Sequence, residues 1–157
     1  MRFTPFVVVL GLVFACNTPT DDTIDVTHDV CAPVAISAAN ADLAQLSGIA
    51  GAMALWAARG ASTLALATPS AIEVRFEPAA PAFHGQYDDQ ASVVYINRTI
   101  DDPAALSIVI AHELGHAFGL RHVDRSERAS LMNPGNLATP PSDADRRELE
   151  ALWGPCD

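Results

Sequence analysis

The stretch HELGHAFGLRH, residues 112–122, carries the spacing around which the rest of this chain is arranged. Residues four apart lie on one face of a helix, with Cβ atoms about 5 to 6 Å apart, so His112 and His116 can share one ion. Gly119 can end the helix, because glycine reaches positive φ at little cost, and His122 can then return as a third ligand. Three protein ligands and one open position are typical of a catalytic zinc ion.

Glu113 lies between these histidines, one residue after the first and three before the second. This spacing places its carboxylate beside the open position of the metal, where it can take a proton from a water molecule. The surrounding segment, residues 102–118, is apolar on most sides and is expected to be a buried helix that starts at Asp102 and Pro103. Unpaired polar groups would be costly there. One bound metal ion would explain why all three polar side chains are placed in this apolar helix. Hydrogen bonding of a buried histidine would explain only one of them at a time.

The pattern H-E-x-x-H-x-x-G-x-x-H, followed later by a methionine turn, resembles the signature of the metzincin zinc proteases. The segment SLMNP, residues 130–134, is similar to that turn, in which Met132 would form an apolar floor beneath the ligands. The ending LEALWG, residues 149–154, is similar to the close of the C-terminal helix in matrixins, a metzincin branch. Pro134 stands where astacin-like and serralysin-like enzymes carry a tyrosine ligand, which favours the matrixins.

This resemblance implies the α/β class and a metzincin-like zincin domain. Its parts would be a small twisted sheet, a backing helix, an active-site helix, the methionine turn and a C-terminal helix. It also implies one catalytic Zn²⁺, a protein or peptide substrate, and hydrolysis of peptide bonds by a metal-activated water with Glu113 as general base. We expect a monomer. The alternative function is a zinc-binding surface lipoprotein without proteolytic activity. A set of three ligands indicates that a metal binds, but it does not by itself indicate that a substrate can reach the metal.

Hydrophobic periodicity predicts the remaining elements. A helix is expected from residue 40 or 42 to 58, with Asn40 as its N-cap and Gly60 as its terminator. Strands are expected over residues 71–77 and 92–97, and a final helix over residues 142–153 with Ser142 as its N-cap.

Residues 82–87 fit either a loop or the edge strand that in metzincins pairs with an extended substrate. His84 in this segment could be an accessory metal ligand. No companion cluster of histidine or cysteine supports a second zinc, so an ordinary loop histidine is the preferred interpretation.

The N-terminus predicts export. Residues 1–15 have Arg2, then an apolar run too short to span a bilayer, and the sequence VFAC at 13–16 resembles a lipobox. We therefore expect a lipoprotein signal peptide, a lipid-modified Cys16 that attaches the protein to a membrane, and an extracytoplasmic location in the periplasm or at the cell surface. An ordinary secretory signal, and hence a secreted protein, is the alternative. Residues 16–30 are predicted to be an acidic tether and residues 31–157 the catalytic domain.

Two cysteines, Cys31 and Cys156, remain once Cys16 is assigned to the lipid anchor. An even pair outside the cytoplasm predicts a disulfide. The rival interpretation is that Cys31 is a thiolate that occupies the fourth zinc position and keeps the enzyme latent, as matrixin propeptides do.

Composition excludes a nucleic-acid function. The chain has 157 residues, which suits one domain, and a net charge of -10. Its nine basic residues form no cluster that could follow a phosphate backbone.

Overall fold

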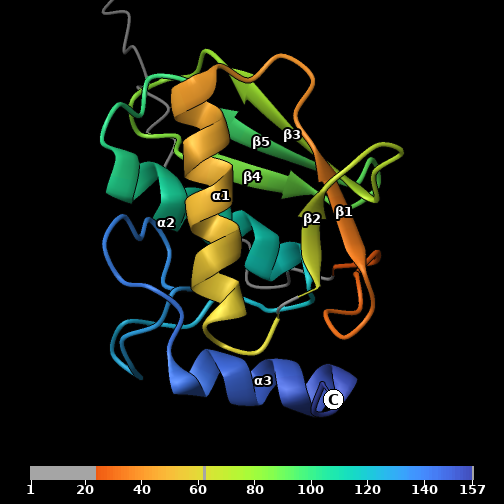
Figure 1. Cartoon of the computed structure of the whole chain (residues 1–157). Helices are drawn as coiled ribbons and strands as arrows, with labels where there is room; N and C mark the ends of the chain where they lie inside the picture. Colours follow the sequence, from red (N-terminus) through yellow and green to blue (C-terminus); the bar gives the residue numbers. More distant parts are fainter. Residues whose placement is uncertain (1–23, 62, 157) are drawn as a thin grey trace, which may run out of the picture.

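The computed structural model describes residues 24–61 and 63–156, which form one sheet and the helices that cover it (Figure 1). The sheet order is β2-β1-β3-β5-β4, and every neighbouring pair is parallel except β4 with β5. The expected α/β class with a small sheet is confirmed. The strands are β1 (Val34–Ser37), β2 (Leu64–Leu66), β3 (Ile72–Glu77), β4 (Gly85–Asp88) and β5 (Val93–Asn97).

The described residues form three helices: α1 (Leu43–Ala57), α2 (Pro103–Ala117) and α3 (Asp143–Trp153). Helix α2 packs against α1 and also against β4 and β5. Figure 1 shows α1 crossing the front of the molecule and α3 lying across its lower end. The most central helix is therefore α2, which is the helix predicted to carry the metal ligands.

The helix starts follow local capping chemistry. Asp42 caps α1, with its carboxylate accepting from the amide of Gln45 at 2.9 Å. The prediction of Asn40 as this cap is wrong, because Asp42 is the residue with extended backbone directly before the first helical turn. Asp102 and Ser142 cap α2 and α3 as predicted.

Two strands, β1 and β2, were not expected from the sequence. They span four and three residues, too short for a clear alternating pattern. Strand β1 nevertheless lies between β2 and β3, with Val34 and Ile36 buried in the core. Of the two alternatives for residues 82–87, a loop or the edge strand, the structure has the edge strand, over residues 85–88.

Residues 24–30 differ from the predicted tether. The amide of His28 donates to the carbonyl of Ala117 at the end of α2, at a distance of 2.8 Å, and Val30 is buried in the core. The side chain of His28 is half-buried, and this burial lowers its pKa. The domain therefore begins before residue 31. The predicted signal peptide and Cys16 lie outside the described residues.

The predicted disulfide between Cys31 and Cys156 is present, with the two Cα atoms 4.9 Å apart. It joins the N-terminal segment to the residues that follow α3. The sulfur of Cys31 is thus engaged in a covalent bond and is not a thiolate directed at a metal.

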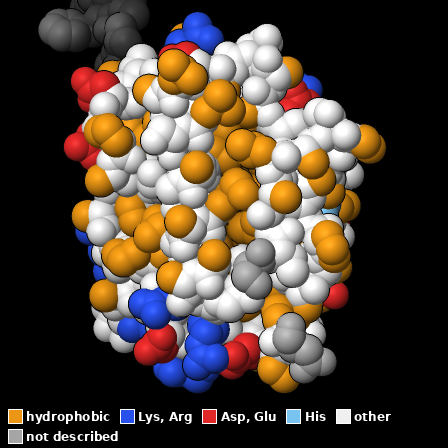
Figure 2. Space-filling model, viewed as in Figure 1, with side chains coloured by type: hydrophobic (Ala, Val, Ile, Leu, Met, Phe, Trp, Pro, Cys, Tyr) orange, Lys and Arg blue, Asp and Glu red, His pale blue; other side chains and the backbone are white. Residues whose placement is uncertain are grey.

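The face that carries α1 is largely uncharged. Figure 2 shows hydrophobic side chains over its middle and charged side chains gathered at its lower end, near α3. Ion pairs at that end join Arg59 to Asp143 and Arg146 to Glu150. Among the described helices, none is long and apolar enough to cross a membrane.

Candidate metal centre

Three histidine side chains converge at the C-terminal half of α2. The Nε2 atom of His122 lies 3.2 Å from Nε2 of His112 and 3.2 Å from Nε2 of His116. Two nitrogen ligands of a tetrahedral zinc ion, each about 2.0 to 2.1 Å from the metal, are about 3.3 Å apart. The spacing of these donors therefore fits one zinc ion. No other group of three or more potential ligands lies this close within the described part of the chain.

Backbone carbonyls hold two of these imidazoles in the tautomer that a metal requires. Nδ1 of His112 lies 2.7 Å from the carbonyl oxygen of Leu131, and Nδ1 of His116 lies 2.8 Å from that of Leu120. A carbonyl oxygen can only accept, so both Nδ1 atoms carry hydrogen. The Nε2 lone pairs are then directed toward the common point, as in metal sites whose outer hydrogen bonds orient the ligands.

Burial also keeps these two ligands neutral. Loss of solvation lowers the pKa of His112 to about 4 and that of His116 to about 3, against a usual value of 6.5. Both imidazoles are therefore unprotonated near neutral pH and can bind a cation without first releasing a proton.

Gly119 makes the turn that returns the third histidine. Its φ is +98°, in the region that favours glycine, and α2 has ended two residues earlier at Ala117. The chain can then bring His122, which is exposed, back to the two buried histidines. This matches the role predicted for the glycine from its spacing.

Met132 lies in the predicted methionine turn and is fully buried. A side chain at Gly115, between the two ligands of α2, would come within 2.6 Å of the Met132 sulfur. The methionine therefore packs directly on the helix backbone beneath the ligand pair. The indole of Trp56 supports the same helix by donating to the carbonyl of Ala111 at 2.9 Å.

Glu113 is buried beside the triad and is 6% exposed. Burial raises the pKa of its carboxyl to about 8 from the usual 4.5, and the amide N–H of Tyr87, which donates to the carboxylate, acts in the opposite direction. A divalent cation at the triad would also favour the ionised form. The carboxylate is thus positioned where it can exchange a proton near neutral pH.

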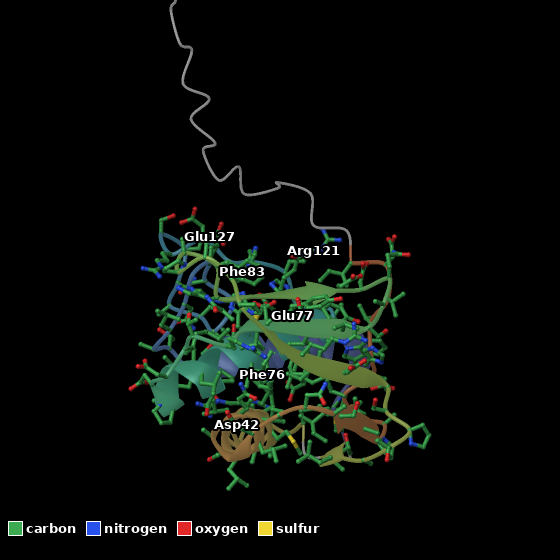
Figure 3. All side chains as sticks on the ribbon, turned by 90° about the horizontal axis from the view of Figure 1, so that it is seen from above. Asp42, Phe76, Glu77, Phe83, Arg121 and Glu127 are labelled. Carbon is green, nitrogen blue, oxygen red and sulfur yellow. A yellow bond between two sulfur atoms is a disulfide. The ribbon has the colours of Figure 1, made fainter. Side chains whose placement is uncertain are left out.

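A cleft of about 410 Å³ opens over these residues. Its wall includes His84, which lines the cleft but is not part of the three-histidine cluster. Figure 3 shows Phe83 on the same side of the molecule as Arg121 and Glu127, opposite Asp42 at the start of α1. The cleft is lined by Ala82, Phe83, His84, Gly85, Val109, His112, Glu113, His122, Pro134, Gly135 and Asn136.

A buried carboxylate fixes the methionine turn to α3. Asp145 is fully buried and accepts from the hydroxyl of Ser130 at 2.5 Å and from the amide of Leu131 at 3.3 Å. It also accepts from the amide and hydroxyl of Ser142, at 2.7 and 2.8 Å. The carbonyl of the same Leu131 accepts from the ligand His112. The carboxylate therefore holds the residue whose carbonyl group orients His112.

Replacing Asp145 by alanine is expected to lower the free energy of unfolding by about 3 kcal/mol or more, because several buried donors would lose their acceptor. Urea unfolding of the zinc-free protein measures this change. Asp143→Ala is the matched control on the same helix, since its side chain is 69% exposed and should contribute less than about 1 kcal/mol. Equal effects of the two substitutions would contradict the assigned role of Asp145.

Comparison with known proteins identifies the family. The model of the family described as Matrixin matches residues 60–154, which is more than half of the chain. The chain belongs to the matrixin family. Membership makes it a metalloprotease of the metzincin type, implies zinc as the metal, and confirms the resemblance seen in the eleven-residue pattern and the methionine turn.

A solved structure confirms the fold of this matrixin. A crystal structure of myroilysin superposes with a TM-score of 0.60 at 12% sequence identity, covering 82% of this chain and 86% of that chain. A second structure of myroilysin has a TM-score of 0.48 at 17% identity, covering 61% and 52%. The first likeness, together with the family, establishes a metzincin-like zincin domain. No curated protein matches the sequence.

Some residues of the matrixin site carried no signal in the sequence. In the sequence, Asp145 is an acid in the first turn of the predicted final helix, and Asn136 lies between the methionine turn and that helix. Asn136 in fact lines the cleft and donates to the carbonyls of Leu131 and Thr139, at 3.0 and 2.7 Å. The role of Asp145 depends on contacts 14 and 15 residues away in the chain, whereas the hydrogen bonds of Asn136 are local and only its place on the cleft wall depends on the fold.

Proposed function

We propose that this matrixin is a zinc-dependent endopeptidase with His112, His116 and His122 as ligands and Glu113 as general base. One observation carries the proposal: three imidazole nitrogens converge beside a buried carboxylate on the wall of an open cleft. A site that only stored or carried zinc would have no need of a buried acid next to the metal, because burial of a carboxyl group is unfavourable.

Each residue of the site has a separate role in the proposed reaction. Bound zinc would supply Lewis-acid activation of a water molecule and of the scissile carbonyl. Glu113 accepts the proton from the attacking water and then delivers it to the leaving amine nitrogen. The carbonyls of Leu131 and Leu120 keep the ligands oriented throughout, and the buried Met132 supports the helix from below.

The shape of the site favours an extended polypeptide as substrate. Strand β4 is the edge strand of the sheet, and Gly85 at its start lines the cleft. An extended peptide can add to such an edge through main-chain hydrogen bonds. Among the described residues that line the cleft, Glu113 is the one acid and none is lysine or arginine, so uncharged substrate side chains should fit best next to the scissile bond.

Removal of the metal tests this function directly. Zinc-loaded protein should cleave a mixed, denatured protein substrate, a chelator should abolish cleavage, and added zinc should restore it. Bound zinc without any cleavage would instead favour the non-proteolytic zinc-binding lipoprotein. Persistence of cleavage after complete metal removal, checked by metal analysis, would contradict the zinc mechanism.

We also propose that the enzyme acts outside the cytoplasm, attached to a membrane through lipid on Cys16. The motif VFAC and the apolar run before it support this location. Mass spectrometry of the mature protein should find a lipid-modified Cys16 at the N-terminus, whereas an unmodified N-terminus beyond Cys16 would indicate secretion.

A further inference from the structure

Gly85, the first residue of β4, lies directly against the side chain of Glu113. A β carbon at Gly85 would lie 2.9 Å from both Cγ and Oε1 of Glu113, and 3.1 Å from the carbonyl oxygen of Tyr95. Contacts below 3.0 Å require one of the two groups to move. Glycine in a strand interior is otherwise unfavourable, because it has no side chain to pack and loses more backbone entropy than other residues.

The neighbours of Gly85 differ in their freedom to move. The Tyr95 carbonyl belongs to β5, which pairs with both β3 and β4 and is held on each side. Of these two neighbours, Glu113 is the flexible one, because its contacting atoms belong to a side chain and those of Tyr95 to the backbone. It is buried, however, and its carboxylate already receives the amide hydrogen of Tyr87. A methyl group at Gly85 would therefore displace the carboxylate from its present position beside the triad.

We propose that Gly85 is a positioning residue for the general base. Its missing side chain lets β4 cover Glu113 closely enough for the Tyr87 amide to hold the carboxylate, while the metal ligands remain untouched. This inference rests on the proposed function, since it concerns how Glu113 reaches the water. The same contact also explains why a glycine stands in a strand at the wall of the cleft.

Gly85→Ala tests the role of this contact in turnover. We expect kcat to fall about 10- to 100-fold, because misplacement of a catalytic group by about 1 Å can cost 100-fold, while KM changes less than about threefold and zinc content is unchanged. An unchanged kcat, a loss confined to KM, or a loss of zinc would each overturn the proposal.

Gly51→Ala is the matched control for crowding. A β carbon there would lie 2.4 Å from the hydroxyl of Ser107, in the packing of α1 against α2, and it makes no contact with Glu113. This variant should keep kcat within about twofold even where its thermal midpoint falls. If Gly51→Ala lowered kcat as much as Gly85→Ala does, the loss of kcat would come from general destabilisation of the fold, and the proposal would be wrong.

A double-mutant cycle, in which the thermal midpoint of the zinc-free protein is measured, gives a second test that does not depend on enzymatic activity. Gly85→Ala should lower the thermal midpoint by about 3 °C or more when Glu113 is present, and should not lower it in a Glu113→Ala background. If Gly85→Ala fails to fold, restored folding of the double variant supports the contact. Equal destabilisation in both backgrounds overturns it.

The two proposals fail in different ways. If Glu113→Ala keeps full activity, the proposed function is wrong, whereas the double-mutant cycle still tests the contact. If Glu113→Ala is inactive while Gly85→Ala keeps full turnover, only the positioning role of Gly85 is wrong.

Discussion

Replacing Glu113 by alanine should reduce peptide hydrolysis by about 1,000-fold or more, because general acid and base catalysis contributes roughly 100- to 10,000-fold. The ligands His112 and His116 are oriented by backbone carbonyls and not by Glu113, so the variant should retain zinc. Hydrolysis of a denatured protein and zinc content, both measured against the unchanged protein, check the two expectations together.

Glu127→Ala is the matched control for this experiment. Glu127 is an exposed acid on the same side of the molecule as Phe83 of the cleft (Figure 3). Its removal changes the net charge by the same amount but should leave hydrolysis within about twofold. Full activity in Glu113→Ala would refute the general-base role, and loss of zinc from that variant would mean that Glu113 helps to hold the metal.

Replacing Cys31 and Cys156 together by serine should lower the free energy of unfolding by about 5 kcal/mol. The bond closes a loop of 125 residues, and the chain-entropy model assigns this value to a loop of that size. Domains have a total stability of roughly 5 to 15 kcal/mol, so the variant would be close to unfolding at room temperature. Urea unfolding at equal zinc content measures the change.

Comparison of the oxidised protein with the same protein after reduction controls for the two serine hydroxyls. Both comparisons should give a similar loss of stability, since both remove the same constraint on the unfolded chain. A loss below about 1 kcal/mol in each would contradict the expectation. It would mean that packing of residues 24–30 and of α3 already holds the two ends of the domain in place.

The sequence by itself was enough to predict the candidate metal centre. The positions of His112, His116 and Glu113 follow from the helical repeat, and the return of His122 follows from the positive φ available at Gly119. These relations are local, spanning eleven residues, so no distant contact was needed to predict them. The caps at Asp102 and Ser142 were predictable for the same reason.

The tertiary structure alone decided how that centre is supported. Strand β1 is too short to show a pattern, and only its pairing with β2 and β3 makes it a core strand. Asp145 accepts hydrogen bonds from residues of the methionine turn 14 and 15 positions away, and Gly85 lies against Glu113, 28 positions away in the chain. Such contacts depend on how separate elements pack. The periodicity of a helix or strand does not predict which of its side chains contact another element.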